Sequence, residues 1–333
     1  MKLIIQIPCL NEEQTLPITL RDLPKKIKGI DVIEYLIIDD GSTDRTVEVA
    51  RKCGVHHIVS FPRNRGLAAA FRAGIDACLR LGADIIVNTD ADNQYCGADI
   101  PKLIEPILEG KAEMVVGDRE TDKIPHFSKT KKFLQKFGSW VVNKAANDDI
   151  SDTTSGFRAY SREAAMRLNV VSEFSYTLET IIQAGWGKIA TANVPIRTNG
   201  VLRESRLFKG IRNYVWRSMN TIIRTYTMYR PLNVFLSIGS ILALIGGSFF
   251  IRFLYFYING DGQGHVQSLI FGSSMLVVGI QIALIGFVAD LIANNRKLLE
   301  ETLYRVRKIE LDYLNKESFE SQEQRQKRKM TVS

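Results

Sequence analysis

Short apolar runs alternate with segments of helical periodicity over the first two hundred residues. The runs of β-rich, apolar composition predict strands at residues 2–8, 32–38, 57–60, 84–89, 112–116 and 189–196. Helical spacing of apolar positions predicts helices at residues 12–23, 44–53, 66–81, 101–108 and 176–184, with a basic, partly helical stretch at 123–146. Strands that alternate with helices indicate an α/β fold with a mainly parallel sheet covered on both faces.

Two much longer apolar runs follow this alternating part. Residues 232–258 contain Arg252 as their only charge, and residues 267–293 contain only Asp290. Each run is long enough to cross a hydrocarbon layer of about 30 Å as a helix. The alternative, a pair of buried helices in a soluble core, fits runs of this length poorly, so the sequence predicts a transmembrane hairpin.

The flanks of the two runs predict an orientation. The connecting residues 259–265 carry no Lys or Arg, whereas Arg224 and Arg230 precede the first run and Arg296 and Lys297 follow the second. Basic residues concentrate on the cytoplasmic side of membrane spans. We therefore expect both termini and the globular part in the cytoplasm.

The segment before the first span has a helical pattern of its own. Apolar residues recur at helical spacing between residues 206 and 229, and basic residues fill much of the other side. This pattern predicts an amphipathic helix in the membrane interface, with packing against the globular domain as the alternative. Beyond the second span a charged tail begins at residue 295, and its last part, 318–333, is expected to be disordered.

Charge and cysteine content narrow the choice of partners. The formal net charge is +8, and the basic residues crowd into 123–144, 203–230 and the tail after residue 296. With two expected spans, anionic lipid and phosphate substrates explain this charge better than nucleic acid does. The four cysteines have no paired or metal-type spacing and are expected to be reduced thiols.

Polar clusters follow four of the expected strands. Asp90 and Asp92 come directly after an apolar strand, and their i, i+2 spacing puts both carboxylates on the same side of the chain. Alone, such a pair would most simply be a solvated acidic turn. Ligands of parallel sheets bind beyond the carboxyl ends of the strands, and polar clusters at 8–12, 39–40 and 64–65 are expected at the same edge. Together they favour one site, in which hard carboxylate oxygens would hold a divalent cation on a diphosphate.

Six short motifs occur in a telling order: Ile7-Pro-Cys-Leu-Asn-Glu-Glu13, Ile38-Asp-Asp-Gly-Ser-Thr-Asp44, Asp90-Ala-Asp-Asn-Gln94, Gly117-Asp-Arg119, Ser155-Gly-Phe-Arg158 and Arg203-Glu-Ser-Arg206. With them the chain resembles glycosyltransferase family 2, and within it the polyprenyl-phosphate sugar synthases of the dolichol-phosphate mannose synthase type. The resemblance extends to about residue 230, and the two-span hairpin matches bacterial and archaeal members. It implies a GT-A catalytic domain over 1–200, a juxtamembrane amphipathic segment over 201–230, two transmembrane helices within 231–294 and a cytoplasmic tail over 295–333.

The resemblance also implies roles for particular residues. The donor, a nucleotide-diphospho-sugar, is expected to contact Pro8, Leu10, Asn11, Glu12, Asp39, Asp40, Asp90, Arg203 and Arg206. Its diphosphate would be bridged by Mg²⁺ or Mn²⁺ on Asp90, Asp92 and Gln94. Members often have an aromatic residue where this chain has Leu10.

On the acceptor side, the resemblance assigns the lipid phosphate to Arg119 and Ser139, with Lys132 and Lys136, or the nearby Lys131, where the family usually has an arginine. Asp92, Arg119 and Arg158 form the expected catalytic set. Arg158 is assigned to the sugar or phosphate and Asp152 to sugar hydroxyls, with a structural salt bridge as the alternative for each.

The implied reaction is an inverting transfer of a hexose to the phosphate of dolichyl or undecaprenyl phosphate. A phosphate acceptor is already an anionic nucleophile and needs no general base. A neutral lipid or polysaccharide acceptor would need a catalytic carboxylate, and residues 153–156 offer none. A catalytically silent membrane scaffold is the alternative from another class, although it gives no reason for retaining Asp90, Asp92 and Arg119. A dehydrogenase is disfavoured because no Gly-x-Gly-x-x-Gly follows the first strand.

Overall fold

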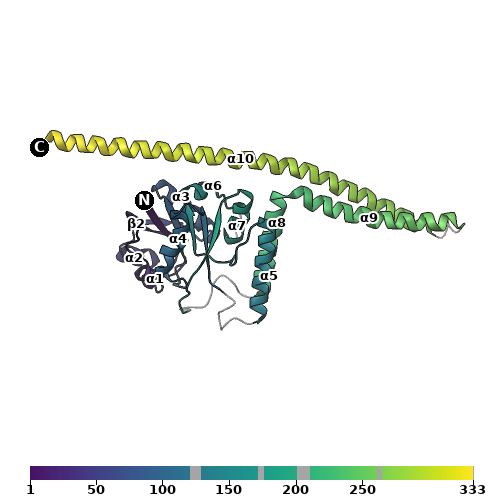
Figure 1. Ribbon diagram of the computed structural model, residues 1–333, viewed down its shortest axis with the longest axis horizontal. Helices are drawn as coiled ribbons and strands as arrows, with labels where there is room; N and C mark the ends of the chain where they lie inside the picture. Colours follow the sequence, from purple (N-terminus) through teal and green to yellow (C-terminus); the bar gives the residue numbers. More distant parts are fainter. Residues whose placement is uncertain (121–128, 172–175, 201–210, 261–264, 333) are drawn as a thin grey trace. The chain divides into compact units, whose positions relative to one another are not determined.

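Seven strands form a single sheet in the order β3-β2-β1-β4-β6-β5-β7 in the computed structural model (Figure 1). The strands are β1 (Lys2–Cys9), β2 (Val32–Asp39), β3 (His57–Ser60), β4 (Ile85–Asn88), β5 (Met114–Asp118), β6 (Arg158–Ser161) and β7 (Thr191–Pro195). β6 runs antiparallel to both of its neighbours, and all other neighbouring strands are parallel. The expected mainly parallel α/β sheet is confirmed.

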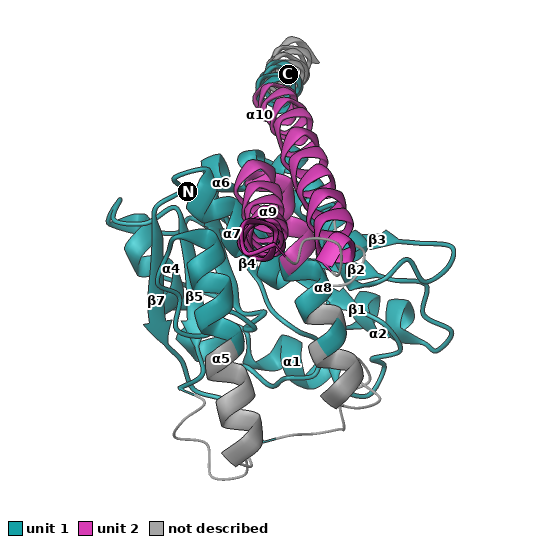
Figure 2. Ribbon diagram, turned by 90° about the vertical axis from the view of Figure 1, so that its right-hand side faces the viewer, with its two compact units in different colours: residues 1–222, 302–333 teal, residues 223–301 magenta. Residues whose placement is uncertain are grey.

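The structure describes the backbone of residues 1–120, 129–171, 176–200, 211–260 and 265–332. Within these ranges, the side chains of 129–137, 211–215, 217, 218, 315 and 317–332 fall outside the description. The chain divides into one unit of residues 1–222 and 302–333 and a second unit of residues 223–301 (Figure 2).

Helices cover both faces of the sheet in the first unit. They are α1 (Leu16–Asp22), α2 (Thr46–Lys52), α3 (Leu67–Arg80), α4 (Ile100–Leu108), α5 (Lys129–Ala146), α6 (Arg162–Arg167) and α7 (Tyr176–Trp186), with a 3₁₀ turn at Gly97–Asp99. Leu3, Ile5 and Ile7 of β1 share one core with α1, α2 and α4. On the other face α3 packs on β1 and β2 so closely that Gly74 leaves no room for a Cβ beside Gln6 and Ile38. Because both faces are covered, β1 reads as an almost continuous apolar run.

Two elements of this unit were not predicted from the sequence. β6 has only four residues, Arg158 to Ser161, and begins with a charged side chain, so it lacks the apolar run that marks the other strands. The short helix α6 follows directly and is capped by Ser161, whose hydroxyl accepts from the Ala164 N–H. α1 also begins later than expected, at Leu16, because residues 10–15 form a loop in which Asn11 has a positive φ of 55°.

The second unit contains two helices long and apolar enough to cross a membrane, α9 (Pro231–Ile258) and the first part of α10 (Val266–Val332). Their backbones touch at glycines. A Cβ on Gly239 would lie 2.6 Å from the Gly279 carbonyl oxygen, and one on Gly246 would lie 2.7 Å from the Gly272 oxygen. Small residues that allow such close approach are typical of helix packing in membranes.

The charged tail differs from its prediction. Residues 318–333 were expected to be disordered, but α10 continues to Val332. The tail is rich in Glu, Gln, Lys and Arg, which are favourable helix formers, so this prediction was wrong because polarity alone does not exclude a helix.

Part of α10 also packs within the globular unit. The Tyr304 hydroxyl donates to Glu163 of α6 over 2.7 Å. Arg307 donates to the carbonyl oxygens of Met166 and Leu168 over 3.1 and 3.0 Å, at the carboxyl end of α6. Leu311 is buried nearby in the same unit. The expected amphipathic helix before the spans corresponds to α8 (Ile211–Tyr229).

Candidate active site

The ends of four strands bring the expected site segments to one edge of the sheet. Cys9 at the end of β1 pairs with Asp39 at the end of β2. Asn88 at the end of β4 pairs with Gln6 of β1 on one side and with Arg158, the first residue of β6, on the other. The loops after β1, β2, β4 and β5 and the loop before β6 therefore leave the sheet at the same edge.

The loop after β1 is tied to the loop after β2. The Asn11 side-chain oxygen accepts from the Thr43 N–H over 2.8 Å, and the Asn11 N–H donates to the Ser42 hydroxyl over 2.9 Å. The Glu12 N–H donates to the Thr46 hydroxyl over 2.8 Å. Pro8 is buried and Leu10 half-buried at the start of this loop. Asn11 thus fixes the two loops that carry most of the expected donor residues.

Asp39 and Asp40 have different partners. Asp39 accepts from the Ser42 N–H, and Asp40 accepts from the N–H groups of Arg65 and Gly66 over 2.7 and 2.9 Å. Burial raises the pKa of the Asp40 carboxyl despite these two hydrogen bonds. Asp40 therefore anchors the 63–66 loop against the strand end.

Gly41, the residue after Asp40, makes this approach possible. It has a φ of +73°, and a Cβ on it would lie 2.5 Å from the Arg63 backbone carbon. Glycine is the residue that tolerates both the positive φ and the close backbone contact.

The acidic pair lies in the turn after β4. Asp92 accepts from the Gln94 N–H over 3.1 Å, and Asn93, with a φ of 57°, has a buried side-chain oxygen without a hydrogen-bond partner among the described residues. A Cβ on Gly156 would lie 3.2 Å from an Asp90 carboxylate oxygen, so the loop before β6 passes directly beside Asp90.

This donor set fits a hard divalent cation. In the part of the chain that is described, no group of three or more Asp, Glu, His or Cys side chains is gathered as metal ligands. Two carboxylates and an unpaired amide oxygen are nevertheless the oxygen ligands that Mg²⁺ accepts when phosphate and water oxygens complete its shell. Asp90, Asp92 and the Asn93 oxygen could hold such an ion.

Arg119, which is 14% exposed, forms an ion pair with the buried Asp152 beside this turn. The Arg119 guanidinium donates to both carboxylate oxygens of Asp152, over 2.6 and 2.9 Å, and to the Thr154 hydroxyl over 2.7 Å. Asp152 is 2% exposed, and burial alone would raise its pKa. The Arg119 charge and the hydrogen bonds outweigh burial, so the pKa of Asp152 lies below its ordinary value. The sequence left two roles open for Asp152, a contact with sugar hydroxyls or a structural salt bridge. In the structure Asp152 forms the salt bridge.

Arg158 lies in the core rather than at the surface of the site. Its side chain is fully buried and donates to the carbonyl oxygens of Ser155, Thr177 and Thr153 and to the Thr180 hydroxyl, over 2.7 to 2.9 Å. In this arrangement it holds the loop before β6 and has no access to a bound sugar or phosphate.

Asn88, Tyr95 and Tyr176 also position the loop before β6, and the sequence did not identify them as site residues. The Asn88 amide donates to the Gly156 carbonyl oxygen and to the Tyr176 hydroxyl, both over 2.8 Å. The Tyr95 hydroxyl accepts from the Gly156 N–H over 2.9 Å, and burial raises the pKa of Tyr95 to about 12. The one available signal was Asn88 itself, a polar residue in an otherwise apolar strand.

The remaining expected residues are only partly visible. Ser139 of α5 is buried, with its hydroxyl 3.1 Å from that of Thr153 in the loop before β6. Lys131, Lys132 and Lys136 lie on α5, but their side chains are outside the described residues, as are Arg203 and Arg206 entirely.

Comparison with known proteins agrees with this geometry. Residues 4–168 match the family described as Glycosyl transferase family 2. The UDP-N-acetylglucosamine–dolichyl-phosphate N-acetylglucosaminyltransferase of Methanococcus voltae is 28% identical over 218 residues, which cover 58% of this chain and 83% of the relative. The prophage bactoprenol glucosyl transferase homolog of Escherichia coli is 27% identical over 312 residues, covering 88% and 94% respectively.

A solved structure shares the fold. Glucosyl-3-phosphoglycerate synthase from Mycobacterium tuberculosis, in complex with Mn²⁺, UDP and glucosyl-3-phosphoglycerate, superposes with a TM-score of 0.52 at 18% identity, over 68% of this chain and 78% of that one. The sheet, the strand-end loops and the family match lead to one conclusion. The chain belongs to glycosyltransferase family 2.

Proposed function

We propose that the protein transfers a hexose from a nucleotide-diphospho-sugar to the phosphate of a membrane polyprenyl phosphate, with inversion at the sugar's C1. One observation carries the proposal: the loop of residues 152–157 bears Asp152, which holds Arg119, and also passes beside Asp90. A cation-binding carboxylate and a phosphate-binding guanidinium are thereby brought to the same edge of the sheet. The named activities of the two relatives, on dolichyl phosphate and bactoprenol, agree with this assignment.

On the donor side, the nucleotide would lie along the loops after β1 and β2. Glu12 and Asp39 are carboxylates at the strand ends and can accept hydrogen bonds from base or ribose groups. Mg²⁺ or Mn²⁺ on Asp90 and Asp92, with the Asn93 oxygen or Gln94 as a further ligand, would neutralise charge on the leaving diphosphate. Arg203 and Arg206 would add positive charge to the same group.

On the acceptor side, Arg119 and Ser139 would orient the lipid phosphate, with Lys132 and Lys136 as further cations. A phosphate oxygen forms the new bond to C1, and the bond from C1 to the diphosphate oxygen breaks with its electron pair on the nucleoside diphosphate. No proton has to leave the nucleophile, so positioning and charge stabilisation supply the catalysis. Arg158 would act by positioning the loop and not by touching substrate.

The membrane arrangement follows from the lipid substrate. The proposed topology has α9 and the apolar part of α10 crossing the bilayer, with the globular unit and both termini in the cytoplasm. The basic residues Arg224, Arg230, Arg296 and Lys297, which flank the two apolar segments, support this orientation.

The decisive experiment is transfer by the purified protein in detergent, with undecaprenyl or dolichyl phosphate and a panel of labelled UDP- and GDP-sugars. We expect one donor to give an acid-labile lipid product in Mg²⁺ or Mn²⁺ and none in EDTA. Metal-dependent hydrolysis of the donor without a lipid product would contradict the acceptor assignment. A folded protein inactive with every donor would favour the scaffold alternative.

The role of Arg119 can be separated from that of the donor site. Arg119→Ala should raise the apparent KM for the lipid phosphate by about tenfold or more and leave the donor KM nearly unchanged, because a charge-assisted contact to phosphate is lost. Arg80→Ala, on an exposed surface ion pair, is the control. Equal increases in both KM values would move Arg119 to the donor side.

A further inference from the structure

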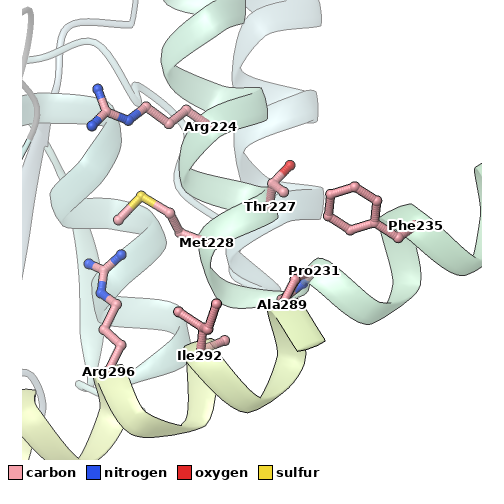
Figure 3. Close-up of a pocket in the computed structure, with 9 residues that line it drawn as sticks. Arg224, Thr227, Met228, Pro231, Phe235, Ala289, Ile292 and Arg296 are labelled. Atoms are coloured by element: carbon pink, nitrogen blue, oxygen red, sulfur yellow. The ribbon is translucent and has the colours of Figure 1, made fainter. Parts of the chain in front are cut away.

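A cavity of about 550 Å³ is lined by residues of the second unit. It is bounded by the end of α8, the start of α9 and the part of α10 that follows its apolar run (Figure 3). Its lining has two kinds of side chain. The guanidinium groups of Arg224 and Arg296 lie on one side with Met228 between them, and Pro231 and Phe235 lie on the other.

Arg296 is incompletely paired. Its Nε donates to Glu300 over 2.7 Å, and its guanidinium lies 5.0 Å from the centre of the Tyr229 ring. Both of its terminal nitrogens are buried and have no hydrogen-bond partner among the described residues. A buried guanidinium nitrogen without an acceptor is unfavourable, and an anion drawn into the cavity would supply the missing acceptors.

Arg224 adds a second cationic side chain, which has no counter-ion among the described residues. It is exposed and makes no ion pair or hydrogen bond with any residue that the structure describes. Glu300 is already engaged by Arg296 and by the Tyr229 hydroxyl, which lies 3.3 Å away. The cavity thus offers two cationic groups on one side and an apolar wall on the other.

From this lining we propose that the cavity binds one anionic glycerophospholipid, with its phosphate between Arg224 and Arg296 and an acyl chain along Phe235 and Ile292. The assignment rests on the proposed membrane placement. Arg224 and Pro231 precede the apolar run of α9, and Arg296 follows that of α10, so the cavity lies at the level of lipid phosphates.

A bilayer lipid fits better than the acceptor. Arg119 and Ser139, to which the acceptor phosphate is assigned, belong to the other unit, whereas every residue that lines the cavity belongs to the second unit. An anionic lipid in this cavity would contact α8, α9 and α10 together. It would therefore stabilise the packing of the junction between α8 and α9 on α10.

The test uses the full-length protein reconstituted in vesicles of dioleoyl phosphatidylcholine and dioleoyl phosphatidylglycerol in equal amounts. After gentle extraction, native mass spectrometry counts the lipid retained by each chain. We expect one phosphatidylglycerol and no phosphatidylcholine. Arg296→Gln and Arg224→Gln should each reduce retention about tenfold, whereas Arg296→Lys, which keeps the charge but not the fork, should lie between.

The matched control is Lys297→Gln, which removes the same charge from the neighbouring position but does not line the cavity. It should retain the lipid as the unchanged protein does. Equal retention in Arg296→Gln and Lys297→Gln would overturn the site, because bulk charge would then explain binding. Displacement of phosphatidylglycerol by equimolar undecaprenyl phosphate would also overturn it and return the cavity to the acceptor.

Transfer to undecaprenyl phosphate, measured on the same preparations, separates the two proposals. Transfer without selective lipid retention would overturn the lipid site alone. A chain that does not insert into the vesicles would overturn both the membrane placement and the lipid site.

Discussion

Asp40 and Asp152 are both buried, yet the pKa values of their carboxyl groups move in opposite directions. Asp40 accepts only from backbone N–H groups, and burial raises its pKa. Burial acts on Asp152 in the same direction, but the Arg119 charge and hydrogen bonds lower the pKa of Asp152 below its ordinary value. A neighbouring cation therefore determines the direction in which burial and hydrogen bonding together move the pKa of each carboxyl group, and Asp152, the one with the lowered pKa, is the one that holds Arg119.

The Asp152 pair should be visible in the pH dependence of stability. A carboxyl group whose pKa is lowered on folding stabilises the protein above its unfolded pKa of about 3.9, and this contribution is lost as the pH falls through the lower folded value. Asp152→Asn should cost about 3–5 kcal/mol at neutral pH because the Arg119 charge, only 14% exposed, loses its counter-ion.

Thermal unfolding between neutral and acidic pH measures this effect. The difference between Asp152→Asn and the unchanged protein should shrink in acid. Asp76→Asn, on the exposed α3 surface, is the control. A melting temperature of Asp152→Asn equal to that of the unchanged protein at neutral pH would contradict the prediction.

Asp92 gives a second prediction for a single residue. Asp92→Asn should lower transfer by about 10²-fold or more while the protein still folds and inserts, because one carboxylate of the proposed cation site is lost. Initial rates in a Mn²⁺ titration, with Asp76→Asn alongside, measure the effect. Unchanged turnover would remove Asp92 from the cation site.

The sequence was informative for residues that directly follow apolar strands and uninformative for those that support them. Asp39 and Asp90 were singled out because a strand end predicts where they emerge, and Arg119 because its motif matches the family. Asn88 and Tyr95 were missed because their partners lie 61 to 88 positions away in the chain. Apart from the polarity of Asn88 within an apolar strand, nothing local to either residue indicates such contacts.

Among the elements, α9 and α10 show how closely two helices can pack when glycines face each other. The Gly246 and Gly272 backbones are in direct contact, and the same is true of Gly239 and Gly279. The apolar composition predicted both helices, but it did not show which of their faces would meet. Glycine recurs at seven-residue intervals on each helix, and the structure shows which glycines of α9 face which glycines of α10.

Gly246 and Gly247 allow a matched test of this packing. Gly246→Leu should separate the helices, since even a Cβ would lie 2.7 Å from the Gly272 oxygen, whereas nothing lies within 4 Å of a Cβ on Gly247. We expect Gly246→Leu to lower the melting temperature in detergent clearly and Gly247→Leu to leave it nearly unchanged. Equal effects of the two substitutions would contradict the observed helix contact.

At the scale of the whole molecule, the boundary between the units was only partly predictable. The first apolar run predicted α9 almost to the residue, but the second unit extends beyond both runs, from residue 223 to residue 301. The return of α10 to the globular unit was not foreseen, because it depends on Tyr304 and Arg307 contacting α6 more than a hundred positions earlier. A charged helix with a few apolar residues gives no local sign of such a partner.

The proposed topology can be tested by cysteine labelling. Asn259→Cys places a thiol in the turn between α9 and α10, and Cys53 is an exposed thiol of the globular unit. In spheroplasts, a membrane-impermeant maleimide should label position 259 at once and Cys53 only after permeabilisation. Labelling of Cys53 in intact spheroplasts would reverse the orientation.

The antiparallel direction of β6 has a consequence for how this enzyme can change. β6 begins at the edge of the sheet where its neighbours β4 and β5 end. The loop that precedes β6 therefore lies at the site, between α5 and β6. Its anchors, Arg158 and Asn88, bind mostly backbone carbonyl groups, which every sequence possesses. If the proposed acceptor site is the one beside this loop, the loop before β6 is the place where evolution or design would alter acceptor choice while the sheet stays intact.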